Sequence, residues 1–232
     1  MSMTRPGQRL NPAEPIADLA ILKALENVVT PHLSDNMSRI VGVTGLTRHN
    51  RTGKLVGSAL TVKTRPGDNL YVYKSLTMIR PGHVLVVDAG GDLNNAIIGE
   101  LMQTYAVGRG CRGFVIDGAI RDVVSFAETP CYARGVVHRG PYKTGPGEVN
   151  VPVSIGGQVI NPGDILVGDE DGLVCFPPAY AKELIALAGQ HAAHEEQVRA
   201  EIGTGALAQS WIDKVLKVAG LDDDTGAERS AS

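Results

Sequence analysis

The chain has 232 residues, of which 43% are hydrophobic and 20% charged, and its formal net charge is −3. This length suits one large domain or a small pair, and it is enough to bury a substantial core. The charge gives no reason to expect a nucleic-acid partner, because such proteins usually present a basic face. We see no apolar signal region and no run near the roughly 18 apolar residues of a membrane span, so we expect a cytoplasmic protein with no membrane partner.

The first part of the chain is predicted to contain a loose arm and two helices. Residues 1–14 are polar and contain prolines, which is typical of a flexible arm. Apolar residues recur at helical spacing over residues 16–29. A second, short helix is predicted over residues 32–37, because Pro31 suits the first turn of a helix.

A short strand and a capped helix follow. Residues 60–63 are predicted to form the strand. Asp68 precedes apolar residues at helical spacing from Leu70 to Ile79, and aspartate is a favoured N-cap residue. Pro81-Gly82 is predicted to end this helix.

Residues 84–123 are the centre of the predicted fold. A strand over residues 84–87 ends at Asp88 and is followed by a glycine loop and a helix that opens near residues 99–102. A second strand over residues 113–116 ends in an acidic turn over residues 117–122. In an open α/β sheet, ligands bind at the carboxyl ends of strands, where helix N-termini present free N–H groups. The sequence therefore predicts a binding site at this edge.

The remaining chain is predicted to add antiparallel strands and two C-terminal helices. Its elements are a strand over 131–137, hairpins within 139–163, strands at 165–167 and 173–176 around an acidic turn, a long helix from Pro178 to about 202, and a helix over 207–218. We predict one α/β domain over residues 15–220 between the arm and a disordered acidic tail over 221–232.

Three other features are better explained by structure than by chemistry. Cys111, Cys131 and Cys175 lack zinc-finger spacing and are expected to be buried or free thiols in a reducing compartment. Residues 108–113 match GxGxxG, but they follow a predicted helix and precede a strand, which favours helix capping over nucleotide binding. The His191–His194 pair matches neither metalloprotease order, so we favour exposed helix polarity over zinc.

Arg121, Asp122 and the Gly99–Met102 loop are the candidate functional residues. An arginine can bind a carboxylate with two parallel hydrogen bonds, and an aspartate is a suitable oxygen ligand for Mg²⁺. The N–H groups of Leu101 and Met102 could hold a second carboxylate or an enolate oxygen. Together these groups would suit a 2-oxo acid. On spacing alone, an ordinary helix-start aspartate paired with an exposed arginine remains the alternative.

The Gly99–Met102 motif followed by Asp117-Gly118-Ala119-Ile120-Arg121-Asp122 resembles the RraA-like family. That family contains metal-dependent 4-hydroxy-4-methyl-2-oxoglutarate / 4-carboxy-4-hydroxy-2-oxoadipate aldolases and the RNase E regulators called RraA. The similarity extends over residues 30–176 and includes Ser34-Asp35, Arg65-Pro66-Gly67-Asp68-Asn69, Pro81 to Asp88, Pro162-Gly163-Asp164 and Asp169 to Gly172. It implies a compact α/β/α domain with a swivelling β/β/α core, assembled as homotrimers or hexamers with active sites between subunits.

The resemblance also implies roles for individual residues. Arg121, helped by the Gly99–Met102 amides, would bind the substrate carboxylate, and Asp122 would be the direct ligand of Mg²⁺ or Mn²⁺. Glu100 would hold waters around the metal. A carboxylate from the C-terminal helix of the adjacent subunit, Glu195 or Glu196, would complete the site.

The sequence departs from the family pattern at Tyr73. Aldolase members tend to carry a histidine there, and a phenol with a pKa of about 10 is a poorer proton donor near neutrality. The aldol substrate is therefore left open, whereas binding of a pyruvate-type acid is expected to persist.

The expected activity is a metal-dependent lyase that cleaves a C–C bond beside a 2-oxo acid, by retro-aldol cleavage or by oxaloacetate decarboxylation. The alternative is a non-enzymatic RraA-like regulator that binds a protein partner, but such regulators tend to lose the acidic residues that Glu100 and Asp122 represent. A Schiff-base aldolase is disfavoured because Lys74 and Lys143 lack a supporting context. A methyltransferase is disfavoured because no strand–GxGxG–helix segment is present.

Overall fold

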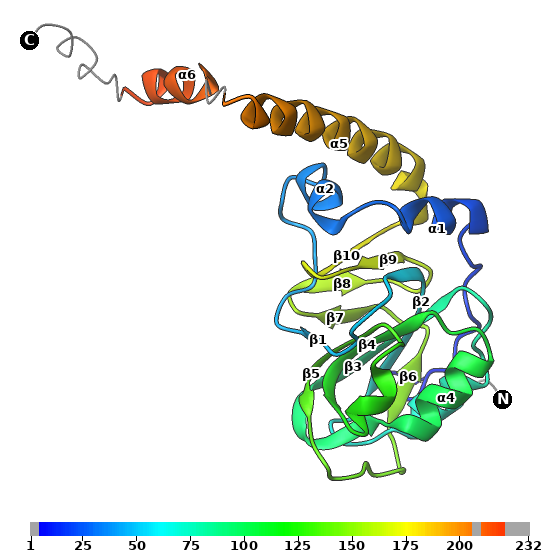
Figure 1. The fold of residues 1–232 in the computed structure, drawn as a ribbon. Coiled ribbons are helices and arrows are strands. Elements are labelled where there is room, and N and C mark those ends of the chain that lie inside the picture. Colours follow the sequence, from blue (N-terminus) through cyan, green and yellow to red (C-terminus); the bar gives the residue numbers. More distant parts are fainter. Residues whose placement is uncertain (1–4, 206–209, 221–232) are drawn as a thin grey trace, which may run out of the picture. The chain divides into compact units, whose positions relative to one another are not determined.

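The computed structural model describes residues 5–205 and 210–220 (Figure 1). The chain divides into two compact units, Met1–Gln190 and His191–Ser232. The predicted tail over 221–232 and the first four residues of the predicted arm lie outside the described residues.

In the described part of the chain, eight strands form one mixed sheet in the order β1-β5-β4-β3-β2-β9-β10, with β6 also paired to β2. The strands are β1 (Thr47–Arg48), β2 (Leu55–Thr64), β3 (His83–Ile98), β4 (Gly113–Ile120), β5 (Cys131–Val136), β6 (Gly147–Val149), β9 (Ile165–Gly168) and β10 (Leu173–Phe176). The central strands β2, β3, β4 and β5 are parallel, and the outer pairings are antiparallel. A separate hairpin joins β7 (Val153–Ile155) and β8 (Gln158–Ile160). The predicted α/β class and the hairpins within 139–163 are confirmed.

Both faces of the central sheet are covered, which explains why its strands are continuously apolar. Leu85 and Val87 of β3 pack on one face against α3 (Leu70–Leu76) and α4 (Glu100–Gly108). Val84 and Val86 point to the other face and pack against residues of the β7–β8 hairpin. The alternation along one strand therefore builds two cores at once.

A third core lies over β9 and β10. It is covered by α1 (Leu19–Leu25), α2 (Thr30–Asp35) and the first turns of α5 (Ala181–Gly203). The helix predicted over 16–29 is shorter because Asp18 caps it, accepting a hydrogen bond of 2.8 Å from the Ala20 amide. Pro31 lies in the first turn of α2, as predicted.

Several boundaries differ from the sequence prediction. The strand predicted over 60–63 extends over the whole of β2. The strand predicted to end at Asp88 continues to Ile98, because Gly90 and Gly91 adopt positive φ values of 66° and 71° and register shifts keep β3 paired with β4. The predicted glycine loop is thus a bulged strand.

The helix boundaries also shift by a few residues. Helix α3 ends at Leu76 rather than near Ile79. Its N-cap residue is Asn69 rather than Asp68, although Asp68 does accept the amide of Leu70, the first residue of the helix. A 3₁₀ turn over Pro178–Tyr180 precedes α5, and α6 covers Ser210–Val218. The predicted start of that last helix at 207 lies outside the described residues.

The GxGxxG match is a helix cap, as expected. The amide of Gly110 donates to the Val107 carbonyl and that of Cys111 donates to the Ala106 carbonyl, the paired bonds of a Schellman motif, with Gly110 at a φ of 88°.

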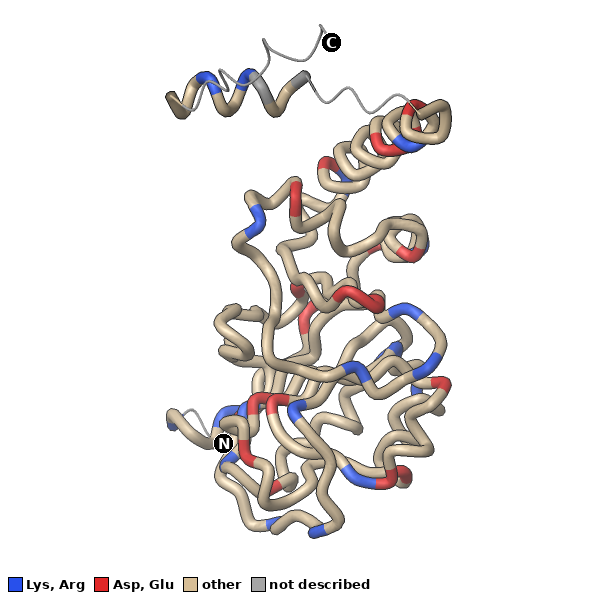
Figure 2. The backbone as a smooth tube through the Cα atoms, turned by 60° about the vertical axis from the view of Figure 1, so that its left-hand side comes forward, with Lys and Arg blue, Asp and Glu red and all other residues tan. Residues whose placement is uncertain are grey.

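The three cysteines are buried and free. Charged residues of both signs are interspersed over most elements (Figure 2). Among the helices in the described residues, none combines the length and apolarity that crossing a membrane requires.

Buried His83 at the start of β3 predicts a pH dependence of stability. Its side chain is 1% exposed, and its Nδ1 accepts the Arg80 amide at 3.1 Å. Burial, with a smaller contribution from the Arg80 charge, lowers the pKa of His83 to about 4. The unfolded chain, with a histidine pKa of about 6.5, therefore binds the proton more readily than the folded chain. This contribution to stability is present above about pH 6.5 and is lost as the pH falls toward 4, by on the order of 3 kcal/mol.

Urea unfolding at neutral pH and at a pH between those two values measures this effect. The His83→Gln variant should lose less stability between the two conditions than the wild type, whereas a variant of exposed His138, His138→Gln, should behave as the wild type does. Equal losses in wild type and His83→Gln would contradict the assignment.

Candidate functional site

A small cavity of about 40 Å³ lies at the carboxyl ends of β3 and β4. It collects most of the residues that the sequence predicted, together with several that it did not. The lining residues are Asn69, Tyr73, Ile97, Ile98, Gly99, Leu101, Met102, Arg121, Asp122, Pro141 and Lys143.

Parallel pairing of β3 and β4 places the predicted residues side by side. Ile98 and Ile120 are register partners, and the Arg121 amide donates to the Ile98 carbonyl at 3.0 Å. Helix α4 begins one residue after Gly99. The strand end that carries Arg121 therefore meets the helix start that carries Leu101, as the sequence predicted for an α/β edge.

Asp122 is held by the N-terminus of α4. Its Oδ2 accepts the Glu100 amide at 3.1 Å and lies 3.6 Å from Arg121 Nε. The residue adopts a left-handed conformation, with φ 53° and ψ 41°. Such a conformation is costly for a residue other than glycine and is concentrated at functional sites. The side chains of Arg121 and Asp122 remain 44% and 46% exposed, so both are available to a ligand.

Position 99 needs a glycine because there is no room for a side chain, and not because of its backbone conformation. Its φ of −149° is extended backbone that any residue adopts. A Cβ atom there would lie 2.5 Å from Asp122 Oδ2 and 2.9 Å from Arg121 Cγ. Any side chain at this position would therefore displace the two charged groups.

We expect Gly99→Ala to leave the chain folded and to lower activity at this cavity by at least tenfold, since a displacement of about 1 Å is enough for a larger loss. Thermal unfolding and turnover measure the two effects separately. Gly108→Ala is the matched control, because a Cβ at Gly108, at the other end of α4, would meet nothing within 4 Å. Gly99→Ala activity equal to that of Gly108→Ala would refute the close-packing argument.

Lys143 is a cation of the cavity that the sequence analysis did not place there. Its Nζ lies 5.8 Å from the centroid of the Tyr73 ring, a cation–π distance. No sequence pattern links it to the site, because it lies in a glycine- and proline-rich loop far along the chain from Tyr73. Only the pairing of that loop with the turn before α3 brings the two together.

Asn69 was also missed. It is 2% exposed, and its Nδ2 donates to the Ile97 carbonyl at 2.9 Å and to Met102 Sδ at 3.3 Å. Within the described residues its Oδ1 has no hydrogen-bond partner. The side chain therefore ties the start of α3 to the end of β3 and to α4.

The donor set of the cavity suits an anionic ligand and a hard divalent cation. Arg121 and Lys143 supply positive charge, and Asp122 supplies carboxylate oxygens. Neither histidine nor cysteine is among the lining residues. Mg²⁺ and Mn²⁺ favour oxygen ligands, and Mg²⁺ is usually held by one or two carboxylates with several waters, whereas zinc sites use nitrogen and sulfur. Asp122 therefore fits a Mg²⁺-type ion better than zinc.

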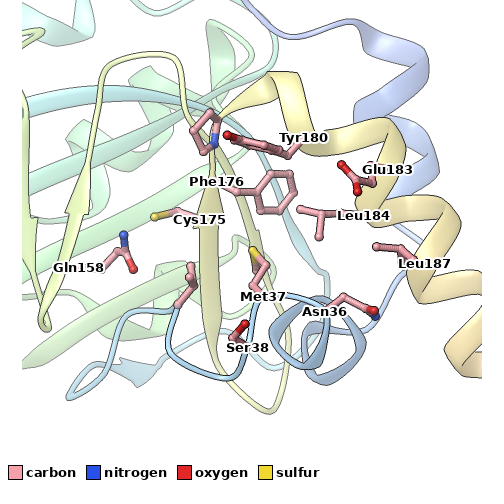
Figure 3. Close-up of a pocket in the computed structure, with 12 residues that line it drawn as sticks. Asn36, Met37, Ser38, Gln158, Cys175, Phe176, Tyr180, Glu183, Leu184 and Leu187 are labelled. Carbon is pink, nitrogen blue, oxygen red and sulfur yellow. The ribbon is translucent and has the colours of Figure 1, made fainter.

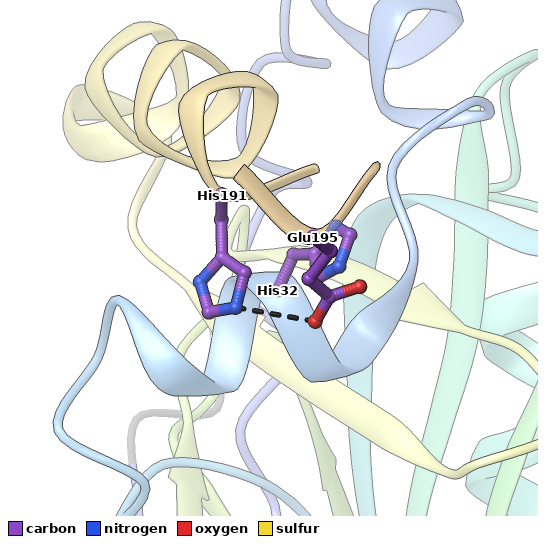
Figure 4. A group of neighbouring side chains, drawn as sticks. All are labelled: His32, His191 and Glu195. Carbon is purple, nitrogen blue, oxygen red and sulfur yellow. Dashed lines mark ion pairs between the residues drawn. The ribbon is translucent and has the colours of Figure 1, made fainter. Parts of the chain in front are cut away.

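Two residues predicted for the site, Glu100 and Glu195, are not among the lining residues of this cavity. Glu100 is an exposed residue in the first turn of α4, next to the group that holds Asp122. Glu195 lies on α5 one turn after His191, whose Nε2 is 3.3 Å from its carboxylate (Figure 4). The adjacent Glu196 pairs with Arg199 at 2.6 Å. The role of Glu195 or Glu196 in a neighbouring subunit's site stays a prediction.

A larger hollow of about 470 Å³ lies between the end of α2, β10 and the start of α5 (Figure 3). Figure 3 shows Met37, Phe176 and Leu184 pointing into it, and Glu183 at its edge. Its lining contains no lysine or arginine. It offers apolar surface but no positive charge, whereas the smaller cavity is lined by Arg121, Asp122 and Lys143.

Comparisons with known proteins identify the family of the chain. The family profile described as RraA-like, Aldolase/RraA, matches residues 30–175. A protein of Halalkalibacterium halodurans with the provisional name 4-hydroxy-4-methyl-2-oxoglutarate aldolase is 33% identical over 204 residues, which cover 86% of this chain and 97% of that protein.

Two solved structures show the same fold. One is Streptomyces coelicolor RraAS2, described as an unusual member of the RNase ES inhibitor RraA protein family, with a TM-score of 0.73 and 27% identity over 80% of this chain and 99% of that one. The other is the RNA-processing inhibitor RraA from Thermus thermophilis, with a TM-score of 0.60 and 31% identity over 65% and 93%. The resemblance predicted over residues 30–176 is confirmed.

Proposed function

Because the chain belongs to the Aldolase/RraA family, we propose that the cavity at Arg121 and Asp122 is the active site of a lyase that cleaves a C–C bond beside a 2-oxo acid. The observation that carries the proposal is the convergence of Arg121, Asp122 and the N-terminus of α4 around one cavity. The names of the aldolase relatives support the same class of reaction.

Arg121 and the first turn of α4 would bind the acid. The guanidinium would take the substrate carboxylate through two parallel hydrogen bonds. The first N–H groups of a helix have no acceptor within the helix, so those of Leu101 and Met102 would donate hydrogen bonds to a substrate oxygen. These donors are fixed before the substrate arrives, and they stabilise negative charge as it develops on the 2-oxo group.

Asp122 would hold a divalent cation, Mg²⁺ or Mn²⁺, whose contribution when bound would be that of a Lewis acid toward the 2-oxo oxygen. Its carboxylate is suited to this task because the Glu100 amide fixes one of its oxygens and its side chain stays half-exposed.

The proton movements would involve Glu100 and Tyr73. In retro-aldol cleavage the C4 hydroxyl loses its proton, the C3–C4 bond breaks, a carbonyl forms at C4, and the electron pair is held as the enolate of pyruvate until C3 is protonated. Glu100 would orient a water that accepts and returns the proton, and the Tyr73 phenol would donate a hydrogen bond inside the cavity. Decarboxylation of oxaloacetate would use the same enolate with CO₂ as the leaving group.

The assembly predicted from the resemblance belongs to the same proposal. A homotrimer or hexamer would let Glu195 or Glu196 of a neighbouring subunit reach this site. The alternative is an RraA-like regulator without enzymatic activity. Two solved structures of relatives described as RNase or RNA-processing inhibitors support this alternative. Asp122 and Glu100 favour the enzyme, because a surface for a protein partner has no need of a carboxylate held at a helix start.

Pyruvate release from 4-hydroxy-4-methyl-2-oxoglutarate and from oxaloacetate tests the proposal. We expect release that requires both protein and Mg²⁺ and that excess EDTA stops. Metal without protein is the essential control, since oxaloacetate decarboxylates spontaneously with metal ions. No protein-dependent release from either compound would favour the regulator.

A further inference from the structure

The hollow between the end of α2, β10 and the start of α5 has the size of a small-molecule site. Its volume of about 470 Å³ falls within the roughly 300–1,000 Å³ that ligand pockets commonly have. All of its lining residues lie in the first compact unit of the chain. It shares no lining residue with the smaller cavity at Arg121 and Asp122. The hollow is therefore separate from the candidate active site.

The floor of the hollow is apolar and is fixed by the protein core. Phe176 of β10 and Leu184 of α5 are 3% and 5% exposed and belong to the core over β9 and β10. Met37, which follows α2, packs against the same core, and its side chain points into the hollow with theirs (Figure 3). A methionine side chain is flexible and makes favourable contacts with aromatic rings. This floor suits the apolar body of a small ligand.

The start of α5 adds a wall of mixed character. Tyr180 ends the turn before α5, and Glu183, Leu184 and Leu187 follow it by three, four and seven residues. This spacing places side chains on one side of a helix, and all four residues line the hollow. Tyr180 is 56% exposed, so the wall is open to a ligand from solvent. It offers apolar surface, a phenol and one carboxylate.

Glu183 is the one charged side chain among the described residues that line the hollow. No other residue in the described part of the chain forms a hydrogen bond or an ion pair with its carboxylate. Arg39 lies in the segment that lines the other side of the hollow, but its Nε pairs with Asp35 at 2.8 Å. A first-turn glutamate also stabilises a helix through the macrodipole, but that role requires no hollow beside it. The charge of the hollow therefore complements a cation.

Two aromatic rings are available to the same cation. Phe176 and Tyr180 both line the hollow, and Figure 3 shows both rings on the side from which α5 starts. The face of an aromatic ring attracts an ammonium group electrostatically. A carboxylate beside two aromatic rings is a combination that favours an organic ammonium group over a neutral group of the same size.

The segment after α2 holds one side of the hollow in a costly backbone conformation. Ser38 and Arg39 follow Met37 with φ values of 60° and 61°, in the left-handed region. Residues other than glycine adopt this conformation at an energetic cost, and such residues are concentrated at functional sites. The Arg39 amide donates to the Ser34 carbonyl at 2.9 Å, which fixes the segment to α2. Met37 is therefore presented to the hollow by a defined backbone.

We propose that this hollow binds an organic cation with an apolar body. The ammonium group lies at Glu183 and the rings of Phe176 and Tyr180, and the apolar body lies over Met37 and Leu184. The inference does not depend on the proposed lyase activity. It adds a second ligand whose charge is opposite to that of a 2-oxo acid.

Methyl NMR of the full-length protein tests where such a ligand binds. The chain has five methionines, of which Met37 lines the hollow and Met102 lines the cavity at Arg121. With ¹³C-methyl methionine as the label and Met37→Leu to assign the signal, phenethylamine should shift the Met37 signal. The Met102 signal should stay where it is, so it serves as the internal control.

Two analogues of the probe test the chemical class of the ligand. 2-Phenylethanol has a hydroxyl in place of the ammonium group of phenethylamine, and 3-phenylpropionate carries a carboxylate. Titration of the Met37 signal should give about tenfold tighter binding for phenethylamine than for 2-phenylethanol, which corresponds to about 1.4 kcal/mol. The carboxylate should bind no better than the alcohol.

A charge-neutral variant tests the role of the carboxylate. Glu183→Gln should remove the preference for phenethylamine and leave the affinity for 2-phenylethanol unchanged. The matched control is Glu201→Gln, because Glu201 is an exposed glutamate of the same helix that does not line the hollow. That variant should keep the wild-type preference.

Each other result overturns part of the proposal. Equal affinities for phenethylamine and 2-phenylethanol, or a preference that persists in Glu183→Gln, overturn the cationic class of ligand. A shift of Met102 without one of Met37 overturns the location. A Met37 signal that ignores phenethylamine but moves on dilution of the protein assigns the hollow to a second copy of the chain, and one that changes under neither condition overturns the site altogether. Neither Mg²⁺ nor a 2-oxo acid is present, so these outcomes are independent of the proposed lyase activity.

Discussion

Asp122→Asn is expected to reduce metal-dependent pyruvate release by at least ~10³-fold while the chain stays folded. Asparagine keeps the size of the side chain and tolerates the left-handed conformation that Asp122 adopts at φ 53°. It removes the negative charge that would hold the cation and places a neutral amide at the N-terminus of α4. Steady-state kinetics over a range of Mg²⁺ concentrations, with circular dichroism as the folding check, measure the effect.

Asp88→Asn is the matched control for this variant. Asp88 lies on the central strand β3, and like Asp122 it accepts a nearby amide, that of Gly90 at 3.0 Å from its Oδ1, but it does not line the cavity. Asp88→Asn should retain activity. If Asp122→Asn kept wild-type activity and wild-type Mg²⁺ dependence, the assignment of Asp122 as the metal ligand would be refuted.

Arg121→Lys is expected to lower kcat/KM by about 10²-fold, the scale reported for loss of one well-placed donor. Lysine keeps the charge but cannot form the two parallel hydrogen bonds that a guanidinium makes with a carboxylate. Because the interaction orients the 2-oxo group as well as binding the acid, both KM and kcat should change. Initial rates with either substrate separate the two parameters.

The same substitution at the other end of α4 provides the comparison. Arg109 follows the last residue of α4, and its guanidinium lies 5.9 Å from the Tyr105 ring centroid. Arg109→Lys should leave the kinetics unchanged. Equal kinetics for the two variants would show that the guanidinium geometry of Arg121 is not needed. They would contradict the assignment of Arg121 as the residue that binds the substrate carboxylate.

The positions of Gly99, Arg121 and Asp122 could be predicted because they depend on local signals. Two apolar runs, 84–87 and 113–116, are long enough to be recognised as buried parallel strands, and parallel strands end at the same edge of a sheet. Residues that follow the strand ends must then lie close together. The family resemblance added the roles, but the proximity follows from strand pairing alone.

The β3 strand shows where local signals mislead. Glycine is rare in strands, so Gly90 and Gly91 predicted a loop after Asp88. In the structure their positive φ values allow bulges, and the strand resumes its pairing with β4 up to Ile98. Whether glycines form a bulge or a loop depends on pairing with the neighbouring strand, and the sequence of one strand alone does not reveal that pairing.

Lys143 could not be placed beside Tyr73 for a similar reason. Its position depends on backbone pairing between residues 67–69 and Tyr142, segments far apart in the chain. Such pairing produces no periodicity, and the loop around Lys143 is rich in glycine and proline. Asp68 was predicted to cap α3; the N-cap residue is Asn69, and Asp68, one residue earlier, accepts the Leu70 amide with one carboxylate oxygen and the Thr144 and Gly145 amides with the other.

The most direct test of the account is exchange of the pyruvate methyl protons with deuterated water, followed by NMR. It reports formation of the enolate and does not depend on which aldol substrate the protein uses. The account predicts exchange that requires protein and Mg²⁺, that EDTA abolishes, and that Asp122→Asn and Arg121→Lys strongly reduce. Exchange no faster than with Mg²⁺ alone, or exchange that both variants leave unchanged, would contradict the claim that this cavity stabilises a pyruvate enolate.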